Sequence, residues 1–449
     1  MHARNMSLAG EFREAGPEAD LLLSMLCLRY NPAGLSRIVD LLDKGICWKR
    51  FVTLALRNEV LPTISPILKD HCADALPSEM LAFVDDRFHR NVQRNAVLCQ
   101  ELLNLNEQFR MHDIRIINYK GPETAHRIGL EIDCCQFNDL DFLVRKEQEA
   151  ILKEVLLSLG YRLSEERKSK GQIKDFTYIR ERNHDGSASI AALPGDIYET
   201  GRIIVEPHLQ ITEYRLPIAI EKESLWEAVE FMEFMGKPLP VFAKDDLLLV
   251  LCIAGCKASW KNLKLINHIA ALLNTLPDSV VDRCIDKAKI AGCERMVQMG
   301  LLLANGLFLT EKNPDRMARA RLDEGLMKCA REVVIARSRN ISSIDYHPFP
   351  WRYSSVIMQT LDRPSDRIRY LWRTTTVPYP VHYKRFPLPG FLHNLYRFIV
   401  PFHDYVLVPA GQWYKWRFRP SGSGAFEVHR ALQDFLNRRR TKVAKAEAG

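Results

Sequence analysis

The stretch Asn138-Asp139-Leu140-Asp141-Phe142-Leu143-Val144 decides the predicted fold, because its apolar residues are typical of a buried β-strand. Alternate residues of a strand face the same side, so Asp139 and Asp141 present two carboxylates together and Leu140 lies on the other face. Two adjacent carboxylates in a partly buried place repel each other unless a cation lies between them. Oxygen ligands of this kind suit Mg²⁺ bridged to phosphate, so the stretch predicts a metal site on a strand.

The segments before and after this stretch supply further charged groups. Upstream, Tyr119-Lys120-Gly121 lies at a predicted strand-to-helix junction, where backbone N–H groups and a lysine can hold phosphate. Downstream, Ile204-Val205-Glu206-Pro207-His208 places Glu206 and His208 on one face of another strand. A third carboxylate on a neighbouring strand would complete a two-metal site, with the metals about 3.5–4 Å apart. The competing interpretation is that the acidic pair lies solvated at a strand edge and that Glu206 forms a surface salt bridge.

Hydrophobic periodicity divides the chain into four parts. Residues 1–112 and 216–340 show helical spacing, whereas residues 113–215 contain short β-branched runs between helices and predict a compact α/β core. Residues 341–449 form an aromatic and basic C-terminal extension that ends in a disordered basic tail. The expected fold class is therefore α+β, mainly helical, with a small mixed sheet between helical domains.

Composition excludes a wholly disordered chain, a collagen-like fibre and a highly charged linker protein. The chain has 449 residues, 47% hydrophobic and 26% charged, so it can bury a sizeable core. Lys and Arg number 63 against 55 for Asp and Glu, giving a net charge of +8. This excess permits an anionic ligand such as a nucleotide, but it is not the dense basic stripe of a dedicated nucleic-acid binder.

Cysteine usage and apolar runs indicate the compartment. The 11 cysteines contain no C-x-x-C pair, which predicts reduced thiols in a reducing environment and gives no indication of zinc. The acidic N-terminal residues lack the apolar segment of a signal peptide. The longest apolar run, Leu247 to Cys256, is far shorter than the roughly 20 residues of a membrane span. These features predict a cytoplasmic protein without a transmembrane segment.

The order Lys-Gly, then D-x-D, then a strand with a carboxylate-x-His pattern resembles the uncharacterised nucleotidyltransferase family of the polymerase-β-like superfamily. Residues 48–62 are similar to the helical lead-in of that family, residues 247–273 to its downstream helical signature, and residues 367–396 to its C-terminal part. The resemblance implies a small polymerase-β-like core embedded between helical domains. It also implies transfer of a nucleoside monophosphate from an NTP to an acceptor hydroxyl, with release of pyrophosphate.

The same resemblance implies roles for individual residues. The implied metal ligands are Asp139, Asp141 and Glu206, holding two Mg²⁺ ions with Mn²⁺ as the alternative, and Glu206 is also the implied general base. Lys120 and Gly121 occupy the place of the superfamily's phosphate cradle. The acceptor stays open between a small molecule, a sugar, a peptide and a protein.

The sequence positions of three further basic side chains make them candidates for contact with the nucleotide or for orienting the site. Lys257 and Lys264 lie seven residues apart and would share one face of an unbroken helix, where they would contact a triphosphate or remain solvated. His208 is expected to orient Glu206 or the substrate rather than to bind metal, with a buried structural histidine as the other interpretation.

Several positions depart from the family pattern. Cys135 stands near the place of an arginine, and Ala254 and Ala258 stand where histidines are usual. Pro207 removes a backbone N–H, which predicts that its strand is bulged or at an edge. These departures favour an alternative function, a catalytically inactive binding or scaffold protein. The aromatic and basic region around Trp372 leaves a third interpretation, binding of RNA or of a membrane surface.

Overall fold

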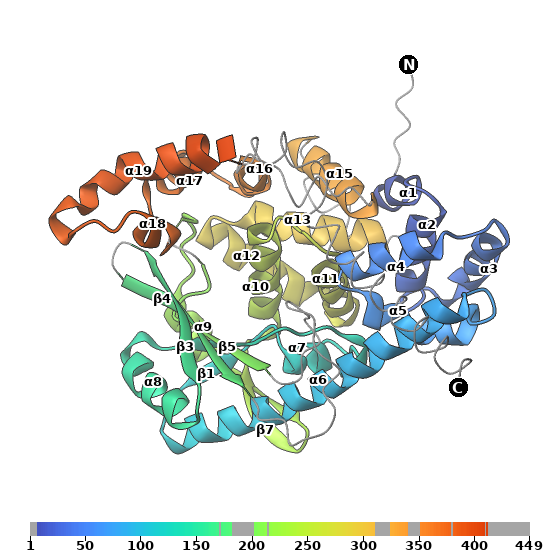
Figure 1. Ribbon diagram of the computed structural model, residues 1–449, viewed down its shortest axis with the longest axis horizontal. Coiled ribbons are helices and arrows are strands. Elements are labelled where there is room, and N and C mark those ends of the chain that lie inside the picture. Colours follow the sequence, from blue (N-terminus) through green and yellow to red (C-terminus); the bar gives the residue numbers. More distant parts are fainter. Residues whose placement is uncertain are drawn as a thin grey trace, which may run out of the picture.

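The computed structural model places a mixed β-sheet beside a larger body of helices (Figure 1). The C-terminal helices α16 to α19 lie along the upper edge of that view, with α18 and α19 near the tip of strand β4. The predicted α+β class, mainly helical, is confirmed. The predicted basic tail lies outside the described residues, which are 7–169, 172–181, 202–212, 215–309, 324–339, 351–378, 380–408 and 410–411.

Seven strands form one mixed sheet in the order β3-β4-β5-β2-β1-β7-β6. Strand β2 (Leu140–Val144) has the predicted bounds and is buried along its whole length. It pairs in parallel with β5 (Arg202–His208) and antiparallel with β1 (Ile116–Asn118), so the acidic stretch enters the middle of the sheet. The remaining strands are β3 (Arg162–Ser169), β4 (Gln172–Glu181), β6 (Glu230–Phe234) and β7 (Lys237–Val241).

The β6–β7 hairpin lies in a segment that was expected to be helical. Its two-residue turn consists of Met235 and Gly236, which both have positive φ, 50° and 79°. Two positive φ values are what a tight hairpin turn needs, because that backbone twist matches the twist of the flanking strands. The hairpin joins the sheet through β7, which pairs in parallel with β1 at Val241 and Asn118. The sheet therefore extends beyond the segment 113–215.

Pro207 was expected to place its strand at an edge or at a bulge, but β5 is an internal strand between β4 and β2. In the ladder between β5 and β4, Val205 pairs with Tyr178 and His208 pairs with Asp175. The ladder skips the two residues of β5 between these pairs. The register is the same on both sides of this interruption. The missing N–H of Pro207 is thus accommodated by a local gap in one ladder.

Helices cover the sheet and build the rest of the molecule. The long α6 (Ser78–Met111) runs from the N-terminal helices to the sheet (Figure 1). The ring of its Phe109 lies 5.5 Å from that of Phe142 on β2. Phe142 alternates with Asp141 along the strand, so α6 covers the face opposite the carboxylate. Among the helices of the described ranges, none is long and apolar enough to cross a lipid bilayer.

The other α-helices before residue 310 are α1 (Leu8–Arg13), α2 (Pro17–Cys27), α3 (Leu35–Asp43), α4 (Trp48–Arg57), α5 (Leu61–Cys72), α7 (Pro122–Arg127), α8 (Glu149–Ser158), α9 (Lys222–Glu227), α10 (Lys244–Lys257), α11 (Leu263–Thr275), α12 (Asp278–Ala291) and α13 (Glu294–Ala304). Those after it are α15 (Glu324–Ser338), α16 (Trp351–Thr360), α17 (Pro364–Thr376), α18 (Pro380–Arg385) and α19 (Tyr396–Phe402). Short 3₁₀ or π turns are η1 (Pro32–Gly34), η2 (Ile132–Cys134), η3 (Lys146–Gln148), η4 (Asn305–Leu309), η5 (Gly390–Leu395) and η6 (His403–Leu407).

Candidate functional site

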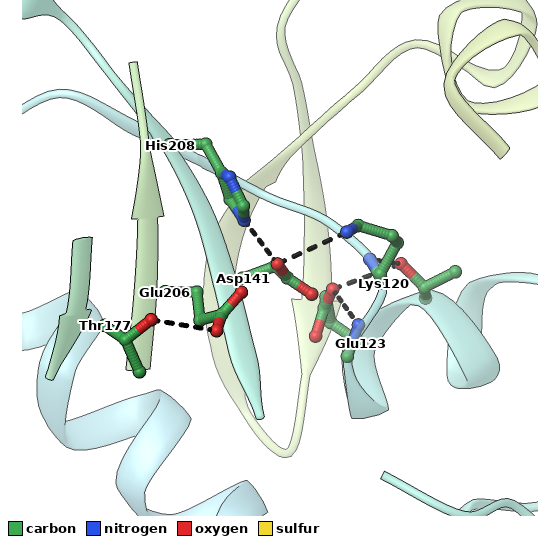
Figure 2. Close-up of polar contacts among 8 residues, drawn as sticks. Lys120, Glu123, Asp141, Thr177, Glu206 and His208 are labelled. Atoms are coloured by element: carbon green, nitrogen blue, oxygen red, sulfur yellow. Dashed lines mark hydrogen bonds and ion pairs between the residues drawn. The ribbon is translucent and has the colours of Figure 1, made fainter. Parts of the chain in front are cut away.

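Two carboxylates and an imidazole converge where β2 and β5 pair. Asp141 and Glu206 are direct partners in the parallel register, and His208 follows two residues later on the same face (Figure 2). The ligand atoms of these three side chains all lie within 4.8 Å of one another. His208 Nε2 lies 2.5 Å from Asp141 Oδ1, and the Thr177 hydroxyl donates to Glu206 Oε1 at 3.1 Å. Strand alternation predicted that Asp139 lies with Asp141 and that Glu206 lies with His208, and the structure brings Asp141, Glu206 and His208 together.

Lys120 and Tyr119 close one side of this cluster. The Lys120 ammonium lies 3.3 Å from Asp141 Oδ1 and 4.7 Å from the centre of the Tyr119 ring. The Tyr119 ring lies 5.5 Å from the His208 ring, and the Tyr119 amide donates to the backbone oxygen of Asp141 at 3.3 Å. Lys120 thus places a positive charge on Asp141, and Tyr119 supports both Lys120 and His208. The role of Tyr119 was not predicted, although it directly precedes the Lys-Gly pair.

The Lys120–Gly121 turn differs from an open phosphate cradle. The Gly121 N–H donates to Glu123 Oε1 at 3.0 Å, and the Lys120 N–H donates to the Thr124 hydroxyl at 3.0 Å (Figure 2). A Cβ at position 121 would lie 2.3 Å from Glu123 Oε2, so glycine leaves the space that this carboxylate fills. A phosphate oxygen would therefore have to displace Glu123 to reach the Gly121 amide.

Electrostatics distinguish the two aspartates of the D-x-D stretch. Burial, reinforced by Asp141 and Glu206, raises the pKa of Asp139 to about 7. Burial opposes ionisation of Asp141 as well, but Lys120 and His208 outweigh it and lower the pKa of Asp141 to about 2. Asp139 is not among the three side chains whose ligand atoms lie within 4.8 Å. The site thus holds more negative charge than Lys120 offsets, which is the condition that favours a bound cation.

The prediction that Lys257 and Lys264 share one helical face is wrong. Lys257 is the last residue of α10, and Lys264 is the second residue of α11. Ser259 and Trp260, both at φ 51°, separate the two helices. The Lys264 ammonium lies 2.5 Å from Glu59 Oε2, and it donates to the backbone oxygen of Gln136 at 3.3 Å. Its charge nevertheless acts on the site, because it lowers the pKa of Asp139 against the larger effect of burial.

A polar clamp on α6 holds the segment that leads into β2. Asn91, Arg94 and Asn95 are all buried. Arg94 donates to the backbone oxygens of Phe137 at 3.1 Å and Asn138 at 2.7 Å, and both asparagines donate to the backbone oxygen of Cys135 at 2.8 Å. The clamp fixes the backbone just before Asp139, and sequence reasoning missed it. Three polar residues at i, i+3 and i+4 on a helix with an apolar stripe were the available signal.

The Lys-Gly turn, the central acidic strand and the neighbouring Glu-x-His strand all lie within the part of the chain that matches a known family. A model of the uncharacterised nucleotidyltransferase family matches residues 44–309, more than half of the chain. The chain belongs to this nucleotidyltransferase family. The family match spans the whole sheet and its carboxylates, but it ends before residues 367–396, which also resembled the family. None of the curated proteins compared with the chain matches it.

Proposed function

We propose that this member of the nucleotidyltransferase family is a Mg²⁺-dependent enzyme that transfers a nucleoside monophosphate from an NTP to an acceptor hydroxyl. The observation that carries the proposal is the direct pairing of Asp141 with Glu206 on one face of the sheet, beside Lys120 and His208. In the reaction, a bond forms between the acceptor oxygen and the α-phosphorus, and pyrophosphate leaves. The acceptor is a small molecule, a sugar, a peptide or a protein side chain.

The donor set fits a divalent cation. Asp139, Asp141 and Glu206 offer carboxylate oxygens, the ligands that Mg²⁺ prefers, and they would hold two ions. Burial and the neighbouring carboxylates raise the pKa of Asp139, and this supports the assignment because a bound cation would offset both effects. The imidazole of His208 beside them also suits Mn²⁺. Bound metal ions would offset the negative charge that develops on the transferred phosphoryl group.

The remaining side chains of the site have separate tasks in this proposal. Glu206 accepts the proton of the acceptor hydroxyl, with its carboxylate oriented by the Thr177 hydroxyl. Lys120 binds the phosphates of the NTP from its position beside Asp141, and His208 orients Asp141. Gly121 contributes its amide after Glu123 has moved aside. Lys264 adds positive charge near Asp139 while it remains paired with Glu59, and Lys257 is a more distant candidate on α10.

Calorimetric titration of an NTP panel with Mg²⁺ tests the site. The parent is expected to bind nucleotide only with metal, and Asp139→Asn/Asp141→Asn is expected to weaken that binding by more than about 100-fold, because the metal ligands are lost. Asp245→Asn is the matched control, since Asp245 is also buried and lies 3.1 Å from Lys287 in another part of the fold. Equal nucleotide binding by the parent and the double variant would show that the assignment is wrong.

A catalytically inactive binding or scaffold protein is the second candidate. It is favoured by the contact of Glu123 with the Gly121 amide, which fills the phosphate cradle, and by the pairing of Lys264 with Glu59. Pyrophosphate release separates the two functions. Labelled NTP incubated with an acceptor panel should release pyrophosphate if the protein is an enzyme. Metal-dependent binding without release on any acceptor would support the scaffold.

A further inference from the structure

A second cluster of metal-ligating side chains lies in the C-terminal arm, which we define as the described residues between Pro364 and Leu407. His382 comes from α18, and His403 and Asp404 begin the turn η6. His382 Nε2 lies 2.9 Å from Asp404 Oδ1, and His403 Nδ1 lies 2.8 Å from the same oxygen. All three ligand atoms lie within 4.8 Å of one another. This cluster is outside the residues that match the nucleotidyltransferase family.

The arm buries these polar side chains and exposes large apolar ones. His382 is 0% exposed and His403 is 3% exposed, whereas Trp372 and Phe398 are 65% and 73% exposed. Burying an imidazole costs free energy unless its nitrogens find partners. The arm also buries Tyr396 and Val400, which are 2% and 0% exposed, so the two buried histidines need partners for their nitrogens inside the arm.

The backbone of η6 brings neighbouring side chains to one point. Consecutive residues of an α-helix point about 100° apart around its axis, yet His403 and Asp404 are consecutive and their side-chain atoms are 2.8 Å apart. The turn that carries them is a π turn, which in proteins occurs frequently at functional sites. Pro401, near the end of α19, has no N–H to continue the regular helical ladder just before this turn.

We propose that His382, His403 and Asp404 bind one divalent transition-metal ion, with Zn²⁺ as the first candidate. Two imidazoles and one carboxylate suit Zn²⁺ or a neighbouring first-row ion, whereas Mg²⁺ prefers oxygen ligands only. The side chain of Asp404 is 23% exposed, which leaves room for a water molecule as the fourth ligand. Because the ligands come from α18 and η6, the ion would cross-link two elements of the arm that are separated along the chain.

Arg385 competes with metal at this cluster. Its Nη1 lies 3.1 Å from His403 Nε2, and a guanidinium can only donate, so Nε2 accepts and the proton of His403 is on Nδ1, facing Asp404. For Nδ1 to bind a metal ion, the proton must move to Nε2 and Arg385 must turn away. Arg385 is exposed and has the freedom to do so. Arg385→Gln is therefore expected to tighten metal binding several-fold, whereas a cluster that is only hydrogen-bonded would gain no metal affinity.

Cobalt titration of the full-length protein, stripped with a chelator, tests the proposal. Co²⁺ reports its coordination through visible absorption, and competition with Zn²⁺ then gives the zinc affinity. The parent is expected to bind one equivalent at this site, and His382→Gln is expected to lose more than about 100-fold in affinity. The glutamine amide can still donate to Asp404, so this variant keeps the hydrogen bond and removes the ligand. Asp141→Asn is the control for the sheet site and should keep the cobalt spectrum.

A cysteine at position 382 keeps the test decisive if the glutamine variant folds poorly. A thiolate is a good zinc and cobalt ligand but a weak hydrogen-bond partner, so His382→Cys should restore metal binding and add thiolate absorption to the cobalt spectrum. Loss of binding in His382→Gln and its return in His382→Cys would support the metal site. Absence of this cobalt spectrum in the parent, or an affinity unchanged in His382→Gln, would overturn the proposal.

Discussion

The sheet site and the cluster in the C-terminal arm combine carboxylates with imidazoles but differ in charge. On the sheet, burial and the neighbouring carboxylates Asp141 and Glu206 raise the pKa of Asp139 to about 7. In the arm, burial also opposes ionisation of Asp404, but hydrogen bonds from His382 and His403 outweigh it and lower its pKa. The sheet site favours a bound cation because of its excess negative charge. The cluster in the arm favours a bound cation because two of its three ligands are imidazoles. We therefore expect oxygen-preferring ions at the first and nitrogen-preferring ions at the second.

The largest expected effect concerns Glu123, whose buried carboxyl accepts a hydrogen bond from the Gly121 N–H beside the sheet site. Burial raises the pKa of Glu123 to about 7 from an ordinary value of 4.5, and the charge of Asp141 adds to this. Between these pH values the folded protein keeps a proton that the unfolded chain has released. The contribution of Glu123 to stability therefore falls as pH rises from about 4.5 to about 7. At about 1.4 kcal/mol per pKa unit, the loss is on the order of 3 kcal/mol.

Urea unfolding of the parent and of Glu123→Gln at pH 4.5 and pH 8 measures this effect. The glutamine does not titrate, so the parent should lose on the order of 3 kcal/mol more than the variant over this interval. Glu149→Gln is the control, because Glu149 also lies in the first turn of a helix but is only half-buried. Parallel pH profiles for the parent and Glu123→Gln would contradict the rise that burial causes in the pKa of Glu123.

The sequence predicts those features of the sheet site that local patterns determine, and it does not predict those that depend on tertiary packing. Strand alternation alone placed Asp139 with Asp141 on one face of a strand and Glu206 with His208 on one face of a second strand, and the structure brings Asp141, Glu206 and His208 together. The pairing of two strands more than 60 residues apart followed only from the family resemblance. The position of Asp139 outside the closest group, and the occupation of the Gly121 amide by Glu123, depend on tertiary packing that no local pattern encodes.

One error in the fold arises where burial overrides local propensity, and the other where a turn lacks its usual residues. The helix expected to carry both Lys257 and Lys264 is interrupted because Trp260, only 1% exposed, turns into the core. No glycine or proline lies between Lys257 and Lys264, although Gly255 leaves the space that the Trp260 ring fills and Asn262 caps the start of α11. The turn of the β6–β7 hairpin has Met235 at a position of positive φ, where Asn or Asp would have given a recognisable signal.

An intermediate effect is expected at Lys120, whose ammonium stands beside Asp141 and in the absence of metal offsets its charge. Lys120→Met should let Mg²⁺ alone bind several-fold more tightly, because a competing cation is removed. It should weaken NTP binding about tenfold, because one charged contact to phosphate, worth roughly 1.4 kcal/mol or more, is lost.

Calorimetry with Mg²⁺ alone and with Mg²⁺ and NTP together measures the two opposite changes at Lys120. Lys120→Arg retains the charge and should change neither affinity by as much as Lys120→Met. Cobalt binding in the C-terminal arm should be unaffected by either variant. If Mg²⁺ alone binds more weakly to Lys120→Met, the lysine supports the fold of the site and does not compete with Mg²⁺ for Asp141. The proposed charge difference between the sheet site and the arm would then be wrong.

The smallest expected effect concerns Thr177, whose hydroxyl donates to Glu206 Oε1 at 3.1 Å. Thr177→Val removes this hydrogen bond at nearly constant volume, so Glu206 loses an orienting contact worth roughly 1 kcal/mol, and Mg²⁺-NTP affinity should fall by about fivefold. Thr360→Val is the matched control, because the buried Thr360 hydroxyl donates to the backbone oxygen of Val356 at 2.9 Å. Both variants should lose similar stability in urea unfolding. Only Thr177→Val should lose nucleotide affinity, since only its hydroxyl orients a carboxylate of the sheet site, and an equal loss in both variants would reduce Thr177 to a structural role.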